Sequence, residues 1–319
     1  MLKQLLLGLI LTFSSCVFAQ NRKPFNLINE SEVTSIAYWN QGESVTYQVN
    51  ETERILRQKK DKKKEVSEEQ NSFHLTLSVL DSTQSSYQME GFYTDFEFEE
   101  EMDEMAEEII RLTENIPIVY HTDEFGKFDS LYNVKSLQRT TGKMVDEIME
   151  MAEIDSPFAK LMMKPFTDQL LKEENQAALF CSEILSIHLI QGGQWKRSKE
   201  YIMDCEFVTM NSYKVEGQAF VELKKIDTKN KLATFKVELL ANEEQISRYI
   251  QDIFVSMCMD LKQKFDAESF RVKLNEKMTF AIDLETGWPR TINSHTEIKV
   301  RDFEKKFIKE IEKHYVLKN

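Results

Sequence analysis

A strict alternation of apolar and polar residues is the feature that most constrains the fold of this chain. Residues 73–79 read Phe-His-Leu-Thr-Leu-Ser-Val, so every second side chain is apolar. Neighbouring side chains of a β-strand point to opposite faces, and this period predicts a strand with one buried and one polar face. Residues 44–57 show the same period. Residues 87–99 are expected to run back beside 73–79, with Phe92, Phe96 and Phe98 on one face. The result is a set of long antiparallel hairpins.

One hairpin motif occurs twice. Ile118–Tyr132 reads IVYHTDEFGKFDSLY and Thr279–Ile292 reads TFAIDLETGWPRTI, each with a strand, an acidic turn ending in glycine and a second strand. Gly126 and Gly287 stand where a hairpin loop needs a left-handed residue, which glycine adopts without a Cβ clash. The acids of both motifs are residues that turns favour, so turn chemistry explains them better than catalysis. Two interpretations are open, an internal duplication or two hairpins of a common type.

The order of the surrounding segments favours duplication. Leu80–Thr83 resembles Ile226–Lys229, Gln41-Gly42 resembles Gln191-Gly192, and an amphipathic helix is expected before each hairpin. We therefore expect an α+β fold of long antiparallel strands in two related halves, each with an inserted amphipathic helix. The halves are assigned to residues 20–133 and 192–319, with a helical connecting segment at 134–191.

Helices are predicted where apolar residues recur every three and four positions. Asn242-Glu243-Glu244-Gln245 has the form of a capping box, which predicts a helix start. At the C-terminus, Phe303, Phe307 and Ile311 are four residues apart, which predicts a short basic helix. The segments with this period are 102–110, 134–153, 156–165, 173–190, 243–261 and 302–313.

The first nineteen residues predict export. Lys3 is followed by an apolar run from Leu5 to Phe13 and by Val17-Phe18-Ala19, the pattern of a signal peptide cleaved after Ala19. Phe13-Ser14-Ser15-Cys16 also loosely resembles a lipobox, which would leave an acylated Cys16 as the mature N-terminus. We expect a periplasmic or outer-membrane-associated protein, held at a membrane only if Cys16 is lipidated.

Charge limits the partners. A formal net charge of −13 argues against nucleic acid, because binding a phosphate backbone requires a basic surface. The basic run Lys59–Lys64 is followed by acidic residues and is expected to be a solvated hairpin tip. The acids from Glu99 to Glu108 lack the loop that wraps calcium and are expected to form a solvated helix face. Four cysteines give no disulfide framework.

No motif for a cofactor, a metal or a catalytic group is present, and no catalytic or metal-ligating residue is assigned. His121 with Asp123 and His295 with Glu297 are two apart on expected strands, so each pair is a weak candidate for a base and its orienting acid. Three further sets of residues are weak candidates for sites and are expected to be core instead or, for the tryptophans, core or turn packing. They are Cys205 and Cys258 as nucleophiles, Trp39, Trp195 and Trp288 as sugar platforms, and Met144, Met149, Met151, Met162 and Met163 as a binding surface.

Three stretches give the chain a family resemblance. The signal peptide ending Val17-Phe18-Ala19-Gln20, the strand entry Gln41-Gly42-Glu43 and the turn Ile282–Gly287 together resemble uncharacterised exported proteins of Gram-negative bacteria. Long strands crossed by helices look, more loosely, like the half-open β-barrel of periplasmic lipoprotein carriers. That likeness implies a cavity for an apolar ligand and carries no catalytic residues.

These expectations lead to a non-enzymatic envelope protein that binds a lipid-like ligand or an envelope protein. A secreted hydrolase with a site assembled from distant residues is one alternative, and a structural or assembly protein of the envelope is another.

Overall fold

The computed structural model describes residues 30–59, 62–98, 104–152, 156, 164, 167–208, 213–258, 270–302 and 305–318. The predicted signal peptide, Cys16 and the acids at 99–103 lie outside these residues, as does most of the helix predicted at 156–165. Within the described part, no helix is long and apolar enough to cross a membrane.

One curved antiparallel sheet of eleven strands dominates the protein, in the order β6-β5-β4-β3-β2-β13-β12-β11-β10-β9-β8. Both predicted β-rich segments contribute to it, and β2 pairs with β13 in the middle. The sheet strands are β2 Ser44–Lys59, β3 Lys62–Ser82, β4 Ser86–Phe98, β5 Ile118–Asp123, β6 Phe128–Leu131, β8 Glu200–Val208, β9 Lys214–Asp227, β10 Leu232–Ala241, β11 Arg271–Asp283, β12 Pro289–Asp302 and β13 Lys305–Lys318. The short strands β1 Glu32–Thr34 and β7 Gln194–Lys196 form a separate pair.

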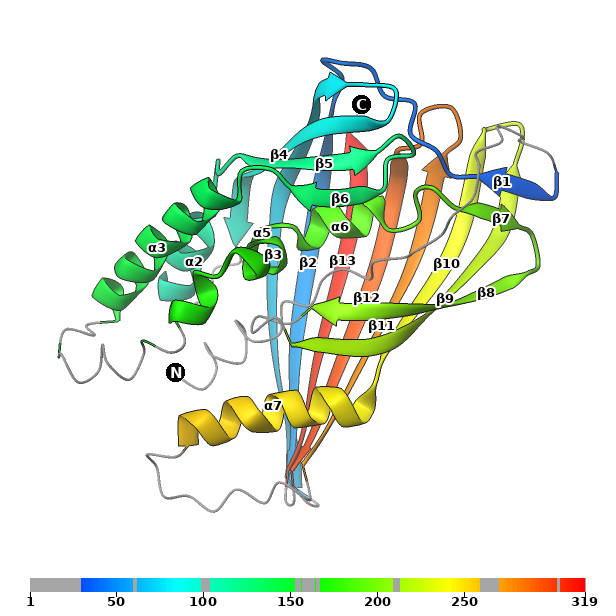
Figure 1. Cartoon of the computed structure of the whole chain (residues 1–319). Helices are drawn as coiled ribbons and strands as arrows, with labels where there is room; N and C mark the ends of the chain where they lie inside the picture. The colour runs from blue at the N-terminus through cyan, green and yellow to red at the C-terminus, as the bar shows by residue number, and fades with distance from the viewer. Residues whose placement is uncertain are drawn as a thin grey trace.

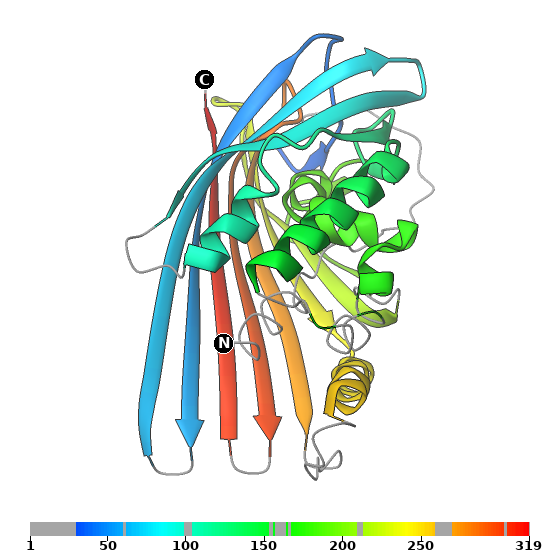
Figure 2. The same cartoon turned by 90° about the vertical axis from the view of Figure 1, so that its left-hand side faces the viewer.

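The helices lie on the concave side of the sheet (Figures 1 and 2). They are α2 Glu104–Arg111, α3 Val134–Met151, the 3₁₀ turn η1 Glu173–Asn175, α5 Gln176–Phe180, α6 Ser182–His188 and α7 Glu243–Cys258. The expected helices at 102–110, 134–153 and 243–261 are confirmed with small changes at their ends. The single helix expected at 173–190 is wrong, because the chain turns at Cys181 (φ −117°) between α5 and α6. This break places buried side chains of both short helices against the sheet.

The two predicted hairpin turns are confirmed, and the same segment of chain contacts both. Gly126 and Gly287 have φ of +88° and +79°. The amide of Ala37 donates to the Phe125 carbonyl (2.9 Å), and the amide of Tyr38 donates to the Thr286 carbonyl (3.1 Å). The turns therefore close one end of the curved sheet together.

The end of α6 supplies the second contact to each turn. His188 Nδ1 donates to the Gly126 carbonyl (2.7 Å), and Gln191 Nε2 donates to the Gly287 carbonyl (2.6 Å). Beneath them the rings of Trp39 and Trp288 stack at 4.0 Å. These contacts fix the end of the sheet from which the concave face extends.

The C-terminal helix expected at 302–313 is wrong, since residues 305–318 form strand β13 in the middle of the sheet. Its concave face carries Phe307, Lys309, Ile311, Lys313 and Tyr315, because these residues pair directly with inward residues of β2 and β12. Two inward lysines interrupt the apolar alternation, and the remaining apolar residues then show a spacing of four. The helical period of the sequence was therefore produced by inward-facing lysines.

The expected faces of β4 are also partly wrong. Asp95 has φ +55° and stands at a β-bulge, where Ser72 pairs with Glu97 and His74 pairs with Thr94. A bulge inserts one residue and reverses the facing of the side chains beyond it. Phe92 consequently shares the outer face with Thr76, whereas Phe96 packs inside against Phe73 at 5.2 Å. Tyr93 lies before the bulge, where it pairs with the buried Leu75 and faces the interior.

Candidate functional site

A belt of polar and charged side chains crosses the concave face in the middle of the sheet. One row of paired residues holds Asn71, Glu51, Lys313 and Ser294 across β3, β2, β13 and β12. The next row holds Glu53, Thr296 and Glu276. Lys309 belongs to the row after that one, in which it pairs with Ile55 and Ile298. With Tyr93 of β4 and Glu183 of α6, which contact it, we call this set the polar belt.

Apolar rows flank the polar belt on both sides. The row on the side of the closed end is fully apolar and at most 6% exposed, and consists of Phe73, Val49, Tyr315, Ile292 and Phe280. On the other side, apolar residues surround Lys309, namely Ile55, Ile298 and Leu274, and the next row continues with Phe307, Val300 and Val272. The charged residues of the belt therefore lie between rows of buried and half-buried apolar side chains.

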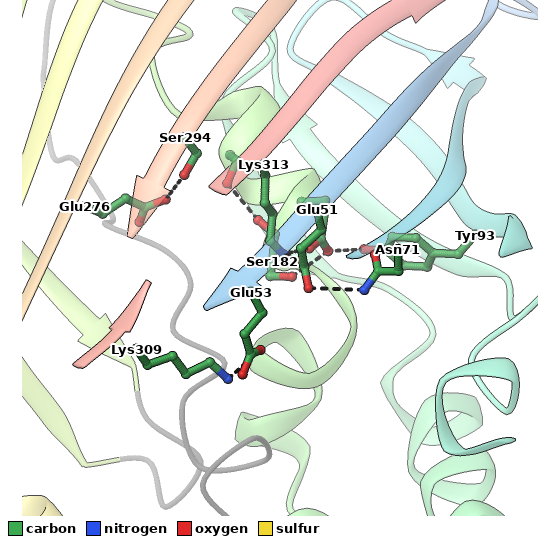
Figure 3. Close-up of polar contacts among 11 residues, drawn as sticks. Glu51, Glu53, Asn71, Tyr93, Ser182, Glu276, Ser294, Lys309 and Lys313 are labelled. Carbon is green, nitrogen blue, oxygen red and sulfur yellow. Dashed lines mark hydrogen bonds and ion pairs between the residues drawn. The ribbon is translucent and has the colours of Figure 1, made fainter. Parts of the chain in front are cut away.

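Ion pairs organise the centre of the polar belt (Figure 3). Lys313 Nζ lies 2.7 Å from a carboxylate oxygen of Glu51 and 2.5 Å from one of Glu183. Lys309 Nζ lies 2.7 Å from Glu53, and its side chain is only 4% exposed. The side chains of Glu51, Glu53 and Lys313 are 18%, 22% and 22% exposed, so solvent reaches this part of the inner face.

Helix α6 places Glu183 at the centre of this network. Its carboxylate accepts hydrogen bonds from the hydroxyls of Tyr93 (2.8 Å) and Ser182 (2.5 Å) as well as from Lys313. Burial opposes its ionisation, but Lys313 and the two hydroxyls outweigh burial and lower the pKa of Glu183 to about 2. Burial likewise opposes the charge on Lys313, yet Glu183 and Glu51 raise the pKa of Lys313 well above its usual value. Both groups are therefore charged over the whole physiological range.

Glu276 and Glu53 differ from this pair, because burial raises the pKa of each carboxyl. Lys309 opposes the rise at Glu53. Glu276 accepts a hydrogen bond from the Ser294 hydroxyl at 2.9 Å, and Thr296 also supplies one. Glu276 forms no ion pair with any residue that the structure describes. Burial is the main cause of the raised pKa of Glu276, and the Ser294 hydroxyl and the nearby charge of Lys313 oppose it.

A polar belt of this kind is not needed to hold an interior together. Buried ion pairs often add less stability than apolar residues of the same volume, because both charges lose their hydration. Perturbed ionisable groups in a concave surface are accordingly candidates for a functional site. The belt has the groups to orient one polar end of a molecule whose remainder contacts the apolar rows.

The histidine pairs considered from the sequence are not formed. Asp123 Oδ1 accepts the backbone amides of Phe125 (3.0 Å) and Lys127 (2.9 Å), so this acid shapes the turn. The His121 ring instead contacts Tyr132 at 5.2 Å. His295 lies 3.5 Å from Glu312, whereas Glu297 pairs with Lys299 at 2.5 Å.

The structure contains a histidine–aspartate pair that the sequence did not suggest. His74 Nδ1 lies 2.8 Å from Asp95 Oδ2 on the outer face, across the bulge of β4. The other ring nitrogen lies 2.7 Å from Gln48 Oε1 and 2.6 Å from Lys318 Nζ. Its contacts in the described part of the chain include no serine, threonine or cysteine nucleophile. This geometry supports a structural polar cluster.

The tryptophan and cysteine predictions agree with the structure where it describes them. Trp39, Trp195 and Trp288 are at most 4% exposed, so they are core residues and not sugar platforms. Cys181 and Cys205 are buried, and burial raises the pKa of Cys181. The described residues contain no group of three or more histidine, cysteine or acidic side chains positioned to hold a metal ion.

Sequence reasoning missed the whole polar belt. A usable signal was present in β2, because Glu51 and Glu53 continue the period of Tyr47 and Val49 on the same face. In β13 the inward lysines obscured the alternation of a strand, and in β4 the bulge obscured the inward position of Tyr93.

The chain matches no known protein-family model and no curated protein.

Proposed function

We propose that this protein is an exported, non-enzymatic envelope protein that binds an apolar or amphipathic ligand on the concave side of its sheet. The observation that carries this proposal is the polar belt between two apolar zones of the inner face. A polar group of the ligand lies at the belt, and its chain lies against Ile55, Val300 and Phe307. The resemblance to lipoprotein carriers points the same way, as does the signal peptide.

Two arguments support a binding role over the hydrolase alternative. A hydrolase needs a nucleophile or an activated water within hydrogen-bonding distance of a base. The best base candidate, His74, has both ring nitrogens occupied by Asp95, Gln48 and Lys318. In contrast, the concave face carries apolar surface and charged groups together, the combination that small-molecule sites use for affinity and orientation.

The second part of the proposal is that the two halves of the chain are related by an internal duplication. Each half contains strands, an inserted helix and then the glycine hairpin, with α2 between β4 and β5 and α7 between β10 and β11. Asp123 and Asp283 each accept two backbone amides of their turns. An internal duplication accounts for this shared order and for the paired contacts of the two turns with residues 37 and 38 and with the end of α6.

Native mass spectrometry of protein purified from its own envelope tests the binding role. We expect a bound lipid-like mass that is lost on mild activation. Val300→Asn, on the inner face, is expected to lower the occupied fraction several-fold, whereas Lys299→Asn, on the outer face of the same strand, leaves it unchanged. A clean ligand-free mass that also fails to take up an added lipid probe contradicts the ligand proposal, and a co-purifying protein would favour a protein partner instead.

A further inference from the structure

The polar belt contains more acidic than basic groups. Glu51 and Glu183 share Lys313, and Glu53 takes Lys309, which leaves Glu276 without an ion-pair partner among the described residues. Four belt carboxylates therefore face two ammonium groups. A ligand that enters this region brings its polar group into a negative field, which favours a positive charge.

Unused hydrogen-bond acceptors point to the same kind of ligand. The side-chain oxygen of Asn71 is buried and accepts no hydrogen bond from the residues that the structure describes, while its amide nitrogen lies 3.4 Å from Glu51. Within the described ranges, Glu276 accepts its side-chain hydrogen bonds from the hydroxyl groups of Ser294 and Thr296. Asn71 on β3 lies four strands from Glu276 on β11, so these acceptors mark opposite ends of the belt, and at Glu276 an ammonium group supplies both donors and charge.

The position of Glu276 suits the head of an amphipathic molecule. It pairs across the sheet with Thr296 within the polar belt, and the neighbouring inward residues of the same two strands, Leu274 and Ile298, are apolar and buried. A head group at Glu276 would therefore lie at the border between the charged row and the apolar zone. An anionic head group fits less well, because both lysines already hold carboxylates at 2.5–2.7 Å.

We propose that the polar belt selects amphiphiles with a positively charged amine head group, and that Glu276 is the ion-pair partner of that amine. This inference rests on the proposed function, because it names the head group of the ligand that the concave face binds. The chain of the molecule supplies affinity through the apolar rows, and the head group supplies selectivity.

Three probes with the same twelve-carbon chain test the inference: dodecylammonium, dodecyltrimethylammonium and dodecanoate, each titrated calorimetrically below its micelle concentration. Dodecylammonium is expected to bind about tenfold or more tightly than dodecanoate, the ratio that one charge-assisted hydrogen bond supplies. Dodecyltrimethylammonium is expected to lie between them, because it keeps the charge and lacks the N–H donors.

Glu276→Gln is the decisive variant. It removes the charge and keeps the shape, so we expect it to weaken dodecylammonium about tenfold and leave dodecanoate unchanged or stronger. Glu297→Gln, on the outer face of β12, is the matched control and is expected to change neither probe. Unaltered urea midpoints show that both variants are folded.

The outcomes separate the inference from the function on which it rests. Equal affinity for the three head groups, a preference for dodecanoate, or an unchanged preference in Glu276→Gln overturns the amine assignment and leaves the binding role standing. Failure of every twelve-carbon probe to bind overturns both.

Discussion

The Nζ of Lys313 lies 2.5 Å from a carboxylate oxygen of Glu183, so an ion pair connects strand β13 to helix α6 inside the protein. Glu51 holds the same ammonium group from β2 at 2.7 Å. The strand at the centre of the sheet is therefore tied to the helix that covers the concave face. The polar belt is at once part of the packing and the candidate binding surface.

Removal of Lys313 is expected to be strongly destabilising. Lys313→Met leaves Glu183 and Glu51 buried without their cation, and the expected loss in the free energy of unfolding is about 3–5 kcal/mol. Lys277→Met is the matched control on the outer face, where Lys277 pairs with Glu238 at 3.5 Å and is half exposed. We expect it to change stability by no more than about 1 kcal/mol. Urea denaturation measures both.

The double variant Lys313→Met/Glu183→Gln distinguishes two causes of the lost stability. One is the loss of the ion-pair attraction, and the other is the cost of leaving a buried carboxylate without its cation. If the penalty comes from an unpaired buried carboxylate, the double variant recovers a large part of the stability that Lys313→Met loses. A double variant as unstable as the sum of its single variants would contradict this explanation.

The two hairpin glycines are expected to resist substitution more strongly than Gly42, because close contacts add to the positive φ that all three share. A Cβ at Gly287 would lie 2.3 Å from the Ile36 carbonyl oxygen, and one at Gly126 would lie 2.6 Å from the Ala37 Cβ. Gly42 also has a positive φ, of +82°, but nothing lies within 4 Å of its Cβ position. Gly42→Ala should therefore lose only the conformational term, roughly 1 kcal/mol.

Gly287→Ala is expected to lower the stability clearly more than Gly42→Ala, because the Ile36 backbone must also shift. Thermal unfolding of the three alanine variants ranks them. Equal losses of stability at all three positions would show that residues 36–38 do not pack against the two turns as closely as the structure describes.

The stability of the protein is expected to fall as the pH drops below neutral, through His188. Its Nδ1 donates to the Gly126 carbonyl, so Nε2 is the acceptor for the Tyr120 hydroxyl at 2.9 Å. Burial lowers the pKa of this buried histidine from 6.5 to about 4. Between these values the unfolded chain binds a proton that the folded chain does not, so the free energy of unfolding decreases as pH falls.

From pH 7 to pH 5 the His188 contribution to this decrease is roughly 2 kcal/mol. Urea titrations of His188→Gln at both values should show that much less pH dependence, and His121→Gln, an outward change on β5, should behave like the unsubstituted protein. The pKa of Glu183, at about 2, has its effect only below the pH range of this experiment. A pH dependence that survives in His188→Gln would assign the effect to other groups.

The fold was predictable where one physical rule decided the local structure. The alternation at Phe73–Val79 predicted β3, and the glycines at 126 and 287 predicted two turns that the structure contains. Prediction failed where inward positions were not apolar. Lys309 and Lys313 made β13 read as a helix, and the positive φ of Asp95 shifted the faces of β4 without a sequence signal.

The candidate site was not predictable for the same reason. Glu51, Glu276 and Lys313 come from strands far apart in the sequence, and only the register of the complete sheet brings them to one level. Single-sequence patterns treat a charged residue as solvent-facing by default. Buried charges break that assumption, and they did so here at the surface that we assign to binding.

Photocrosslinking is the most direct test of the claim that the concave face binds the ligand. A dodecylammonium probe with a photoreactive diazirine at the end of its chain, irradiated with the full protein and digested, locates the bound chain by peptide mass spectrometry. The account predicts labels on inward residues beside the polar belt, such as Ile55, Val300 and Phe307, that disappear when unlabelled dodecylammonium is added in excess. Labels confined to outer-face residues such as Asn50, Lys277 or His295, or labels that excess ligand does not displace, would contradict it.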